Sequence, residues 1–167
     1  MIASQGFRRA AFVGFLLVAP CVYAAEVSGV RIDDRLRVGD SDLVLNGAGL
    51  RTRFFIKVYV GALYASQKSA VPATLINSQA PRRMSLRMMR DLDADALHGA
   101  LQDGLNSNLA PAELAEIKPQ AEQLAIIMKS IGKVREGDTI AIDFSADGVG
   151  IGLNGEARGK VDGAAFA

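Results

Sequence analysis

The chain has 167 residues, half of them hydrophobic, with 19 basic and 18 acidic residues and a formal net charge of +1. This balance gives no strong electrostatic attraction to nucleic acid or to anionic lipid, so no nucleic-acid partner is expected. The single cysteine, Cys21, lies in the N-terminal apolar segment. The remainder therefore forms no disulfide and supplies no thiol nucleophile.

Residues 1–25 have the order of a secretory signal peptide. Arg8 and Arg9 precede the apolar run 10–19, and small residues follow just before Glu26. The run is well short of the roughly 20 residues that a bilayer-spanning helix requires, and no later segment is longer. We therefore expect no stable membrane insertion.

We expect cleavage of the signal after Ala24 or Ala25 and a periplasmic or secreted protein. Residues 26–167 then carry 17 basic and 18 acidic residues, because the signal removes two arginines and no acid. A chain of this length falls in the usual size range of one domain and can bury a core.

Residues 27–65 are predicted to form strands, because they are rich in Val, Leu, Phe and Tyr. Pairs of turn-forming residues divide them into short pieces. These pairs are Asp33-Asp34, Gly39-Asp40 and Asn46-Gly47. The N-terminal third of the domain is therefore expected to be sheet.

Residues 66–81 contain two prolines and are predicted to form a loop with one short helical turn. Residues 82–90 follow, in which apolar and polar side chains alternate with the period of a half-buried strand. The apolar members are Met84, Leu86 and Met88.

Helices are predicted next. Asp93 can cap the first one, whose leucines recur one turn apart on the buried side. These are Leu97, Leu101 and Leu105. Pro111 begins a second helical segment, which Pro119 either kinks or divides in two. Gly132 is expected to end it.

The last part of the chain is predicted to be a meander of strands. Apolar residues occupy every second position in residues 139–145 and 149–153. Pairs of turn-forming residues occur at 147–148 and 154–155. The order of strands, helices and strands favours an α+β fold, in which an antiparallel sheet carries a helical layer on one face.

The side chains that could carry chemistry are few. His98 is the only histidine, so a histidine-based triad has one possible base and a zinc site would need carboxylates alone. Three aspartates at 91, 93 and 95 are spaced like the start of a calcium loop. Ala96 and Gln102 stand where that loop needs Gly and Glu, so a helix N-terminus explains them better. We expect no metal and no cofactor.

The arginines of residues 82–90 are predicted to form an ordinary solvated strand face. They are Arg82, Arg83, Arg87 and Arg90.

The most specific segment is Leu45-Asn46-Gly47-Ala48-Gly49-Leu50-Arg51, followed by residues 55–64, which begin Phe-Ile-Lys-Val-Tyr. It resembles the chalcone isomerase family, especially its bacterial exported branch. There a Gly-Ala-Gly-x-Arg turn precedes a strand of the form Phe-Ile-Lys-x-Thr/Tyr. The resemblance extends over most of residues 27–166. It implies an open-faced sheet, a helical layer and a cleft between them that holds a small ligand.

The resemblance also implies site residues. Members of this family are either isomerases or non-catalytic fatty-acid binders. In the binders an arginine after the glycine turn and a strand tyrosine grip the carboxylate, and these positions correspond to Arg51 and Tyr59. The isomerases use a strand threonine and a tyrosine from the helical layer, whereas residues 91–131 contain no tyrosine. The isomerases also use an asparagine from the helical layer, and Asn106 or Asn108 could stand for it.

Arg51 and Tyr59 can act together only if the chain folds back between them. On one straight strand their separation would be roughly 26 Å. A hairpin centred near Phe55 would place them opposite each other, although residues 52–57 contain no Gly, Pro, Asn or Asp. On the alternative interpretation, Arg51 pairs with an acid such as Asp42 and Tyr59 is an ordinary strand aromatic.

The leading hypothesis is an exported, non-catalytic binder of a small apolar carboxylic acid such as a fatty acid. Arg51 and Tyr59 would hold the carboxylate. The pocket is expected to be lined by Met84, Leu86, Met88 and leucines of the helices.

Two alternatives remain at this stage. One is an isomerase or intramolecular lyase, in which Arg51 polarises a carbonyl oxygen. The other is a structural or partner-binding protein of the envelope, with an exposed sheet face as its interface. Family members continue past the region 159–166 into an amphipathic C-terminal helix that this sequence lacks, so we expect either that the sequence is truncated or that an apolar face is exposed. The oligomeric state is left open.

Overall fold

The structure, a computed structural model, describes residues 25–163. The predicted signal peptide, except Ala25, therefore lies outside the described residues, and so does the end of the chain at 164–167. The expectations of a cleaved signal and of a missing C-terminal helix remain predictions.

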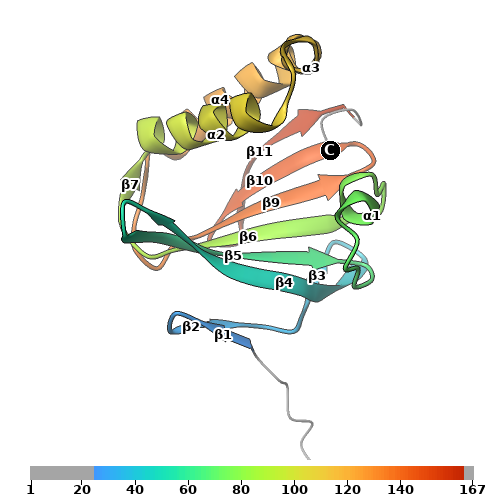
Figure 1. The fold of residues 1–167 in the computed structure, drawn as a ribbon, viewed down its shortest axis with the longest axis vertical. Helices are drawn as coiled ribbons and strands as arrows, with labels where there is room; N and C mark the ends of the chain where they lie inside the picture. Colours follow the sequence, from blue (N-terminus) through green and yellow to red (C-terminus); the bar gives the residue numbers. More distant parts are fainter. Residues whose placement is uncertain (1–24, 164–167) are drawn as a thin grey trace, which may run out of the picture.

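Seven strands of the described part form one antiparallel sheet (Figure 1). They are β3 (Arg35–Val38), β4 (Ser41–Arg53), β5 (Ile56–Ala65), β6 (Arg82–Met88), β9 (Thr139–Ser145), β10 (Gly148–Leu153) and β11 (Glu156–Asp162). Their spatial order is β11-β10-β9-β6-β5-β4-β3. Two short ribbons lie outside this sheet, namely β1 (Ala25–Val27) with β2 (Val30–Ile32), and β7 (Leu92–Asp93) with β8 (Lys133–Val134).

The helices fall where the sequence predicts them. They are α1 (Pro72–Ile76), α2 (Ala94–Asn108), α3 (Pro111–Glu116) and α4 (Lys118–Ile131). Within residues 25–163, no helix is both long and apolar enough to cross a membrane. The predicted α+β class, with an antiparallel sheet and a helical layer, is confirmed.

Local signals account for the helix boundaries. The Asp93 carboxylate accepts a hydrogen bond from the Ala96 amide at 2.8 Å and so caps α2. Pro119 lies in the first turn of α4, where its missing amide costs nothing, so it divides the second helical segment rather than kinking it. Gly132 ends α4 with a φ of +72°, a conformation that glycine adopts without strain.

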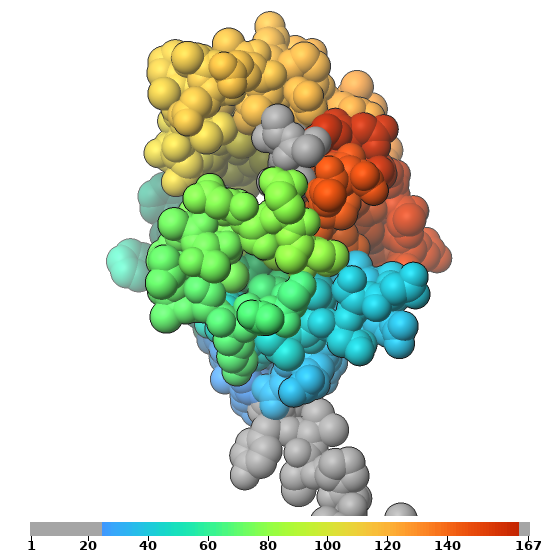
Figure 2. All heavy atoms as spheres, turned by 90° about the vertical axis from the view of Figure 1, so that its right-hand side faces the viewer, coloured from blue at the N-terminus to red at the C-terminus, as the bar shows by residue number. Residues whose placement is uncertain are grey.

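The two faces of the sheet are covered at opposite ends. One face, here called the inner face, includes Val149 and Ile151 of β10. On it, α4 packs over β10 and β11 through Leu124, Ile127 and Met128. On the opposite, outer face, Ile32 of β2 packs over β4 and β5, against Leu43 and the buried residues around it. Figures 1 and 2 show the helices α2 to α4 (yellow to light orange) at one end of the molecule and β1–β2 (blue) at the other. The helices therefore leave part of the inner face of β4, β5 and β6 uncovered, although Met88 at the end of β6 packs against Leu97 of α2.

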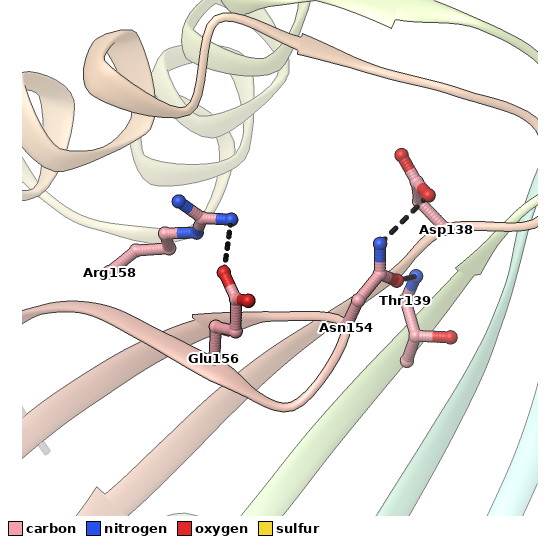
Figure 3. A network of polar contacts seen from close by, with 5 residues as sticks. All are labelled: Asp138, Thr139, Asn154, Glu156 and Arg158. Atoms are coloured by element: carbon pink, nitrogen blue, oxygen red, sulfur yellow. Dashed lines mark hydrogen bonds and ion pairs between the residues drawn. The ribbon is translucent and has the colours of Figure 1, made fainter.

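A polar network links the turn between β10 and β11 to the start of β9 (Figure 3). The Asn154 carbonyl oxygen accepts a hydrogen bond from the Thr139 amide at 2.8 Å, and the Asn154 amide donates to Asp138 at 2.9 Å. Beside them Arg158 pairs with Glu156 at 2.9 Å. Asn154 has a φ of +53° in the turn between β10 and β11, so one residue both shapes this turn and fastens it to β9.

The prediction of a turn at Asn46-Gly47 is wrong, and so is that of a turn at Gly47–Arg51. The strand β4 runs through these residues, and the pairing with β5 shifts register between Leu45 and Gly47. Asn46 instead accepts a hydrogen bond from the Ser69 amide at 2.8 Å. A glycine inside a strand often marks a β-bulge, so an Asn-Gly pair gives the same local signal for both structures.

The arginines of β6 do not form one solvated face. Alternation along the strand directs Arg82 to the inner face, where it is only 7% exposed and its guanidinium lies 5.3 Å from the centre of the Phe144 ring. Arg82 donates hydrogen bonds to the carbonyl oxygens of Leu75 and Ile76 at the end of α1. Burial lowers the pKa of the Arg82 guanidinium.

Candidate functional site

An apolar hollow of about 390 Å³ lies on the uncovered part of the inner face. Its volume is within the range of small-molecule sites. It is open to solvent and is bounded by strand residues: Gly47, Ala48, Gly49, Tyr59, Gly61, Leu63, Met84, Leu86 and Ile142. No acidic or basic side chain is among them.

Three glycines form the floor of this hollow. Gly49 lies directly opposite Gly61, and Gly47 lies opposite Leu63, so all three glycines direct a missing side chain to the inner face. A Cβ atom at Gly47 or Gly49 would meet no atom within 4 Å, and one at Gly61 would make ordinary contacts of 3.5 Å or more. Neither packing nor a positive φ requires glycine here. What the glycines provide is space.

Arg51 and Tyr59 lie opposite each other at one end of the hollow. They are register partners in the β4–β5 hairpin, so their side chains share the inner face. The Arg51 guanidinium carbon lies 5.9 Å from the centre of the Tyr59 ring, which is within cation–π distance. The expected hairpin near Phe55 is confirmed: Arg53 pairs with Ile56 across a turn of Phe54 and Phe55.

The polar groups of this pair are free of other partners within residues 25–163. Arg51 forms no ion pair with any described carboxylate. Asp42, the acid considered for it, lies opposite Arg37 on β3. Neither the guanidinium nor the Tyr59 hydroxyl hydrogen-bonds to a described protein group. Arg51 does not itself line the hollow; it stacks on Tyr59, which does.

The predicted lining is confirmed in part. Met84 and Leu86 line the hollow, whereas Met88 is 2% exposed and packs with Leu97, Val134 and Ile140 in the core beneath α2. The helix leucines do not line the hollow either, because the helices lie over the other end of the sheet. Sequence alternation selects a face of β6 but cannot show which part of that face is covered.

The outer face carries two larger hollows, of about 510 and 530 Å³, which are lined in part by charged side chains. Arg83 and Asp143 form a two-bond ion pair there, with nitrogen–oxygen distances of 2.5 and 2.6 Å, and this pair raises the pKa of Arg83. Tyr64 donates to the Asp33 carbonyl oxygen at 2.9 Å, and burial raises the pKa of its phenol. These groups already have partners, so the outer face fits a structural role.

The glycine floor is the part of the site that sequence reasoning missed. The signal was present: Gly47 and Gly49 are two residues apart, the spacing of one strand face. It becomes readable only once the segment is known to be a strand and not a turn.

Comparison with known proteins identifies the family and the fold of this chain. A family model described as chalcone isomerase-like matches residues 24–167. The chain belongs to the chalcone isomerase-like family. Among solved structures, it is similar to the fatty-acid binding protein of Arabidopsis thaliana, with a TM-score of 0.67, 16% sequence identity and coverage of 86% of this chain and 84% of that one. No curated protein matches this chain significantly.

In this member of the chalcone isomerase-like family the helical layer adds nothing to the hollow. The isomerase alternative calls for a tyrosine from that layer, and residues 91–131 contain none. His98 lies on α2, and no residue of that helix lines the hollow. The candidate site therefore consists of one guanidinium, one phenol and an apolar floor.

Proposed function

We propose that this protein is an exported, non-catalytic binder of a small apolar carboxylic acid such as a fatty acid. The observation that carries the proposal is the opposition of Arg51 and Tyr59, with free donor groups, at the end of a glycine-floored apolar hollow.

The two ends of such a ligand match two parts of this site. A guanidinium presents parallel donors that fit a carboxylate, and a phenol can add a third hydrogen bond. Hydrogen bonds to a charged group contribute about 1.5–3 kcal/mol each. The alkyl chain would lie on Leu63, Met84, Leu86 and Ile142, where each buried methylene contributes about 0.8 kcal/mol.

Two further observations support the proposal. The Arabidopsis thaliana protein of the same fold is described as fatty-acid binding. Export is supported by the charged, apolar and small-residue order of residues 1–25.

The decisive experiment compares an acid with its alcohol. Decanoate and decanol have the same alkyl chain, so only the carboxylate differs. Arg51→Gln is expected to weaken decanoate binding at least about tenfold, because it removes a charge-assisted hydrogen bond. Decanol binding should not change. Calorimetric titration measures both affinities.

The matched control is Arg37→Gln, which removes an exposed arginine from β3, a strand that does not line the hollow. It should leave both affinities unchanged. Unchanged decanoate binding in Arg51→Gln would contradict the proposed clamp. Mass spectrometry of the protein purified from its native host should also show a co-purifying acid and the loss of 24 or 25 N-terminal residues.

A further inference from the structure

The tip of the β4–β5 hairpin exposes large apolar side chains to solvent. Phe54 is 83% exposed, Phe55 is fully exposed and Ile56 is 52% exposed. They are consecutive in the chain, so they form one continuous apolar tip. A group of this kind on a protein surface marks a place where another surface binds.

The backbone of this tip is strained. Phe54 and Phe55 have φ values of +48° and +65°, the conformation of a type I′ turn, which favours Asn-Gly. Aromatic residues rarely adopt positive φ. The two phenylalanines therefore lower the stability of the turn and bury little area within the fold. Two strained, exposed aromatic residues at this place point to a contact outside the molecule.

Charge identifies the kind of partner. The segment 47–61 contains Arg51, Arg53 and Lys57 and no acidic residue, although the whole chain is nearly neutral. The Arg53 guanidinium lies 5.8 Å from the centre of the Phe54 ring, so cations directly flank the apolar tip. Exposed aromatic residues bordered by arginine and lysine are the composition that binds anionic lipid interfaces.

We propose that this hairpin tip docks reversibly on the surface of an anionic lipid bilayer. Phe54 and Phe55 would enter the headgroup region, while Arg53 and Lys57 contact lipid phosphates. The same hairpin carries Arg51 and Tyr59 a few residues away, so docking sets the mouth of the hollow against the lipid from which an acid would be taken or to which it would be delivered. Docking itself does not require that the hollow bind an acid.

The test uses co-sedimentation with phosphatidylcholine vesicles, with and without phosphatidylglycerol. The wild-type protein is expected to sediment with the anionic vesicles and to be released by added salt, because exposed charges are screened. The key variant is Phe54→Asn/Phe55→Gly. It should lose more than about tenfold in vesicle affinity, since the apolar tip is gone. Its melting temperature should rise, since the new residues suit positive φ.

Two matched variants complete the design. Arg53→Gln and Lys57→Gln should each lower the affinity for anionic vesicles about fivefold. Ile126→Ser removes an apolar side chain of α4 that is 69% exposed, and it should change nothing.

Equal vesicle binding by wild type and Phe54→Asn/Phe55→Gly would overturn the proposal. A concentration-dependent dimer that this variant abolishes, without vesicle binding by the wild type, would also overturn it in favour of a second copy. Decanoate binding distinguishes this proposal from the proposed function. The tip variant should bind decanoate normally. Titration of Arg51→Gln with decanoate at high salt, without vesicles, tests the hollow independently of docking.

Discussion

At the scale of single residues, glycines on a strand face need a reason, because glycine in a strand costs about 0.5–1 kcal/mol relative to alanine. Gly47, Gly49 and Gly61 are held neither by a positive φ nor by a neighbour that excludes a methyl group. They share one face, and this face forms the floor of the apolar hollow. We therefore interpret the three glycines as residues that trade stability for ligand space.

Gly49→Leu tests this interpretation. The new side chain would occupy the hollow, where no atom lies within 4 Å of the Cβ position. We expect binding of both decanoate and decanol to be lost, in contrast to Arg51→Gln, which affects only the acid. Unfolding in urea should show that stability is retained or raised by about 0.5–1 kcal/mol.

The control for this prediction is Gly104→Leu, which places the same side chain on an exposed position of α2 with no atom within 4 Å of its Cβ. It should leave both affinities unchanged. If Gly49→Leu still binds decanol as the wild type does, the ligand site lies elsewhere.

At the scale of elements, the β4–β5 hairpin shows how tertiary structure overrides local preference. Its turn contains no residue that favours a turn, yet pairing along most of both strands sets the register that brings Arg51 opposite Tyr59. The loop before β9 has the opposite character. There side-chain hydrogen bonds of Asp138 and Asn154 fasten one connection to another (Figure 3).

Asp138 gives this loop a pH dependence. Hydrogen bonds from the Arg135 amide and the Asn154 side chain lower the pKa of its carboxyl group. A lowered pKa in the folded state adds stability above the unfolded value near pH 4, and this stability is lost as the pH falls through the folded pKa. Asp138→Asn should lower the free energy of unfolding at pH 7 by no more than about 1 kcal/mol, because the group is near solvent.

Urea unfolding at pH 7 and near pH 3 checks this prediction. The difference between Asp138→Asn and the wild type should shrink at the lower pH, because the stability that the charged carboxylate adds is lost progressively as the pH falls below the unfolded value near 4. Asp103→Asn is the control, since the Asp103 carboxylate accepts no hydrogen bond from a described residue. A difference that is constant with pH would mean that charge on Asp138 plays no part.

At the scale of the whole molecule, the covering elements are offset across the sheet. The helices cover the inner face over β10 and β11, and β1–β2 covers the outer face over β4 and β5. The hollow is the part of the inner face that the helices leave uncovered, over β4, β5 and β6. A candidate binding site thus results from incomplete coverage, and the same strands have one packed face and one open face.

Two leucines of neighbouring strands test this offset. Leu43 of β4 is fully buried in the outer-face core, and Leu63 of β5 lines the hollow. Leu43→Ala is expected to lower the free energy of unfolding by about 2–5 kcal/mol, as a cavity in a packed core does. Leu63→Ala should cost below about 1.5 kcal/mol, because its side chain is only partly buried. Thermal and urea unfolding followed by circular dichroism would measure both. Equal costs would mean that the inner face is packed at Leu63.

Much of the fold follows from local physics that is visible in the sequence. Alternation in β6, β9 and β10, the capping aspartate Asp93 and the terminating glycine Gly132 were all predicted. They depend on neighbouring residues in the chain, so the chain alone decides them. The family motif likewise indicated Arg51 and Tyr59.

Tertiary structure decided what depends on residues far apart in the chain. Burial of Arg82 depends on α1 and Phe144, and exclusion of Met88 from the hollow depends on Leu97. Asn46-Gly47 became a bulge because strand pairing continued past it. An alternating pattern states that one face of a strand is apolar. Only the packed molecule shows whether that face meets a helix, another strand or an open hollow, because burial is a property of distant neighbours.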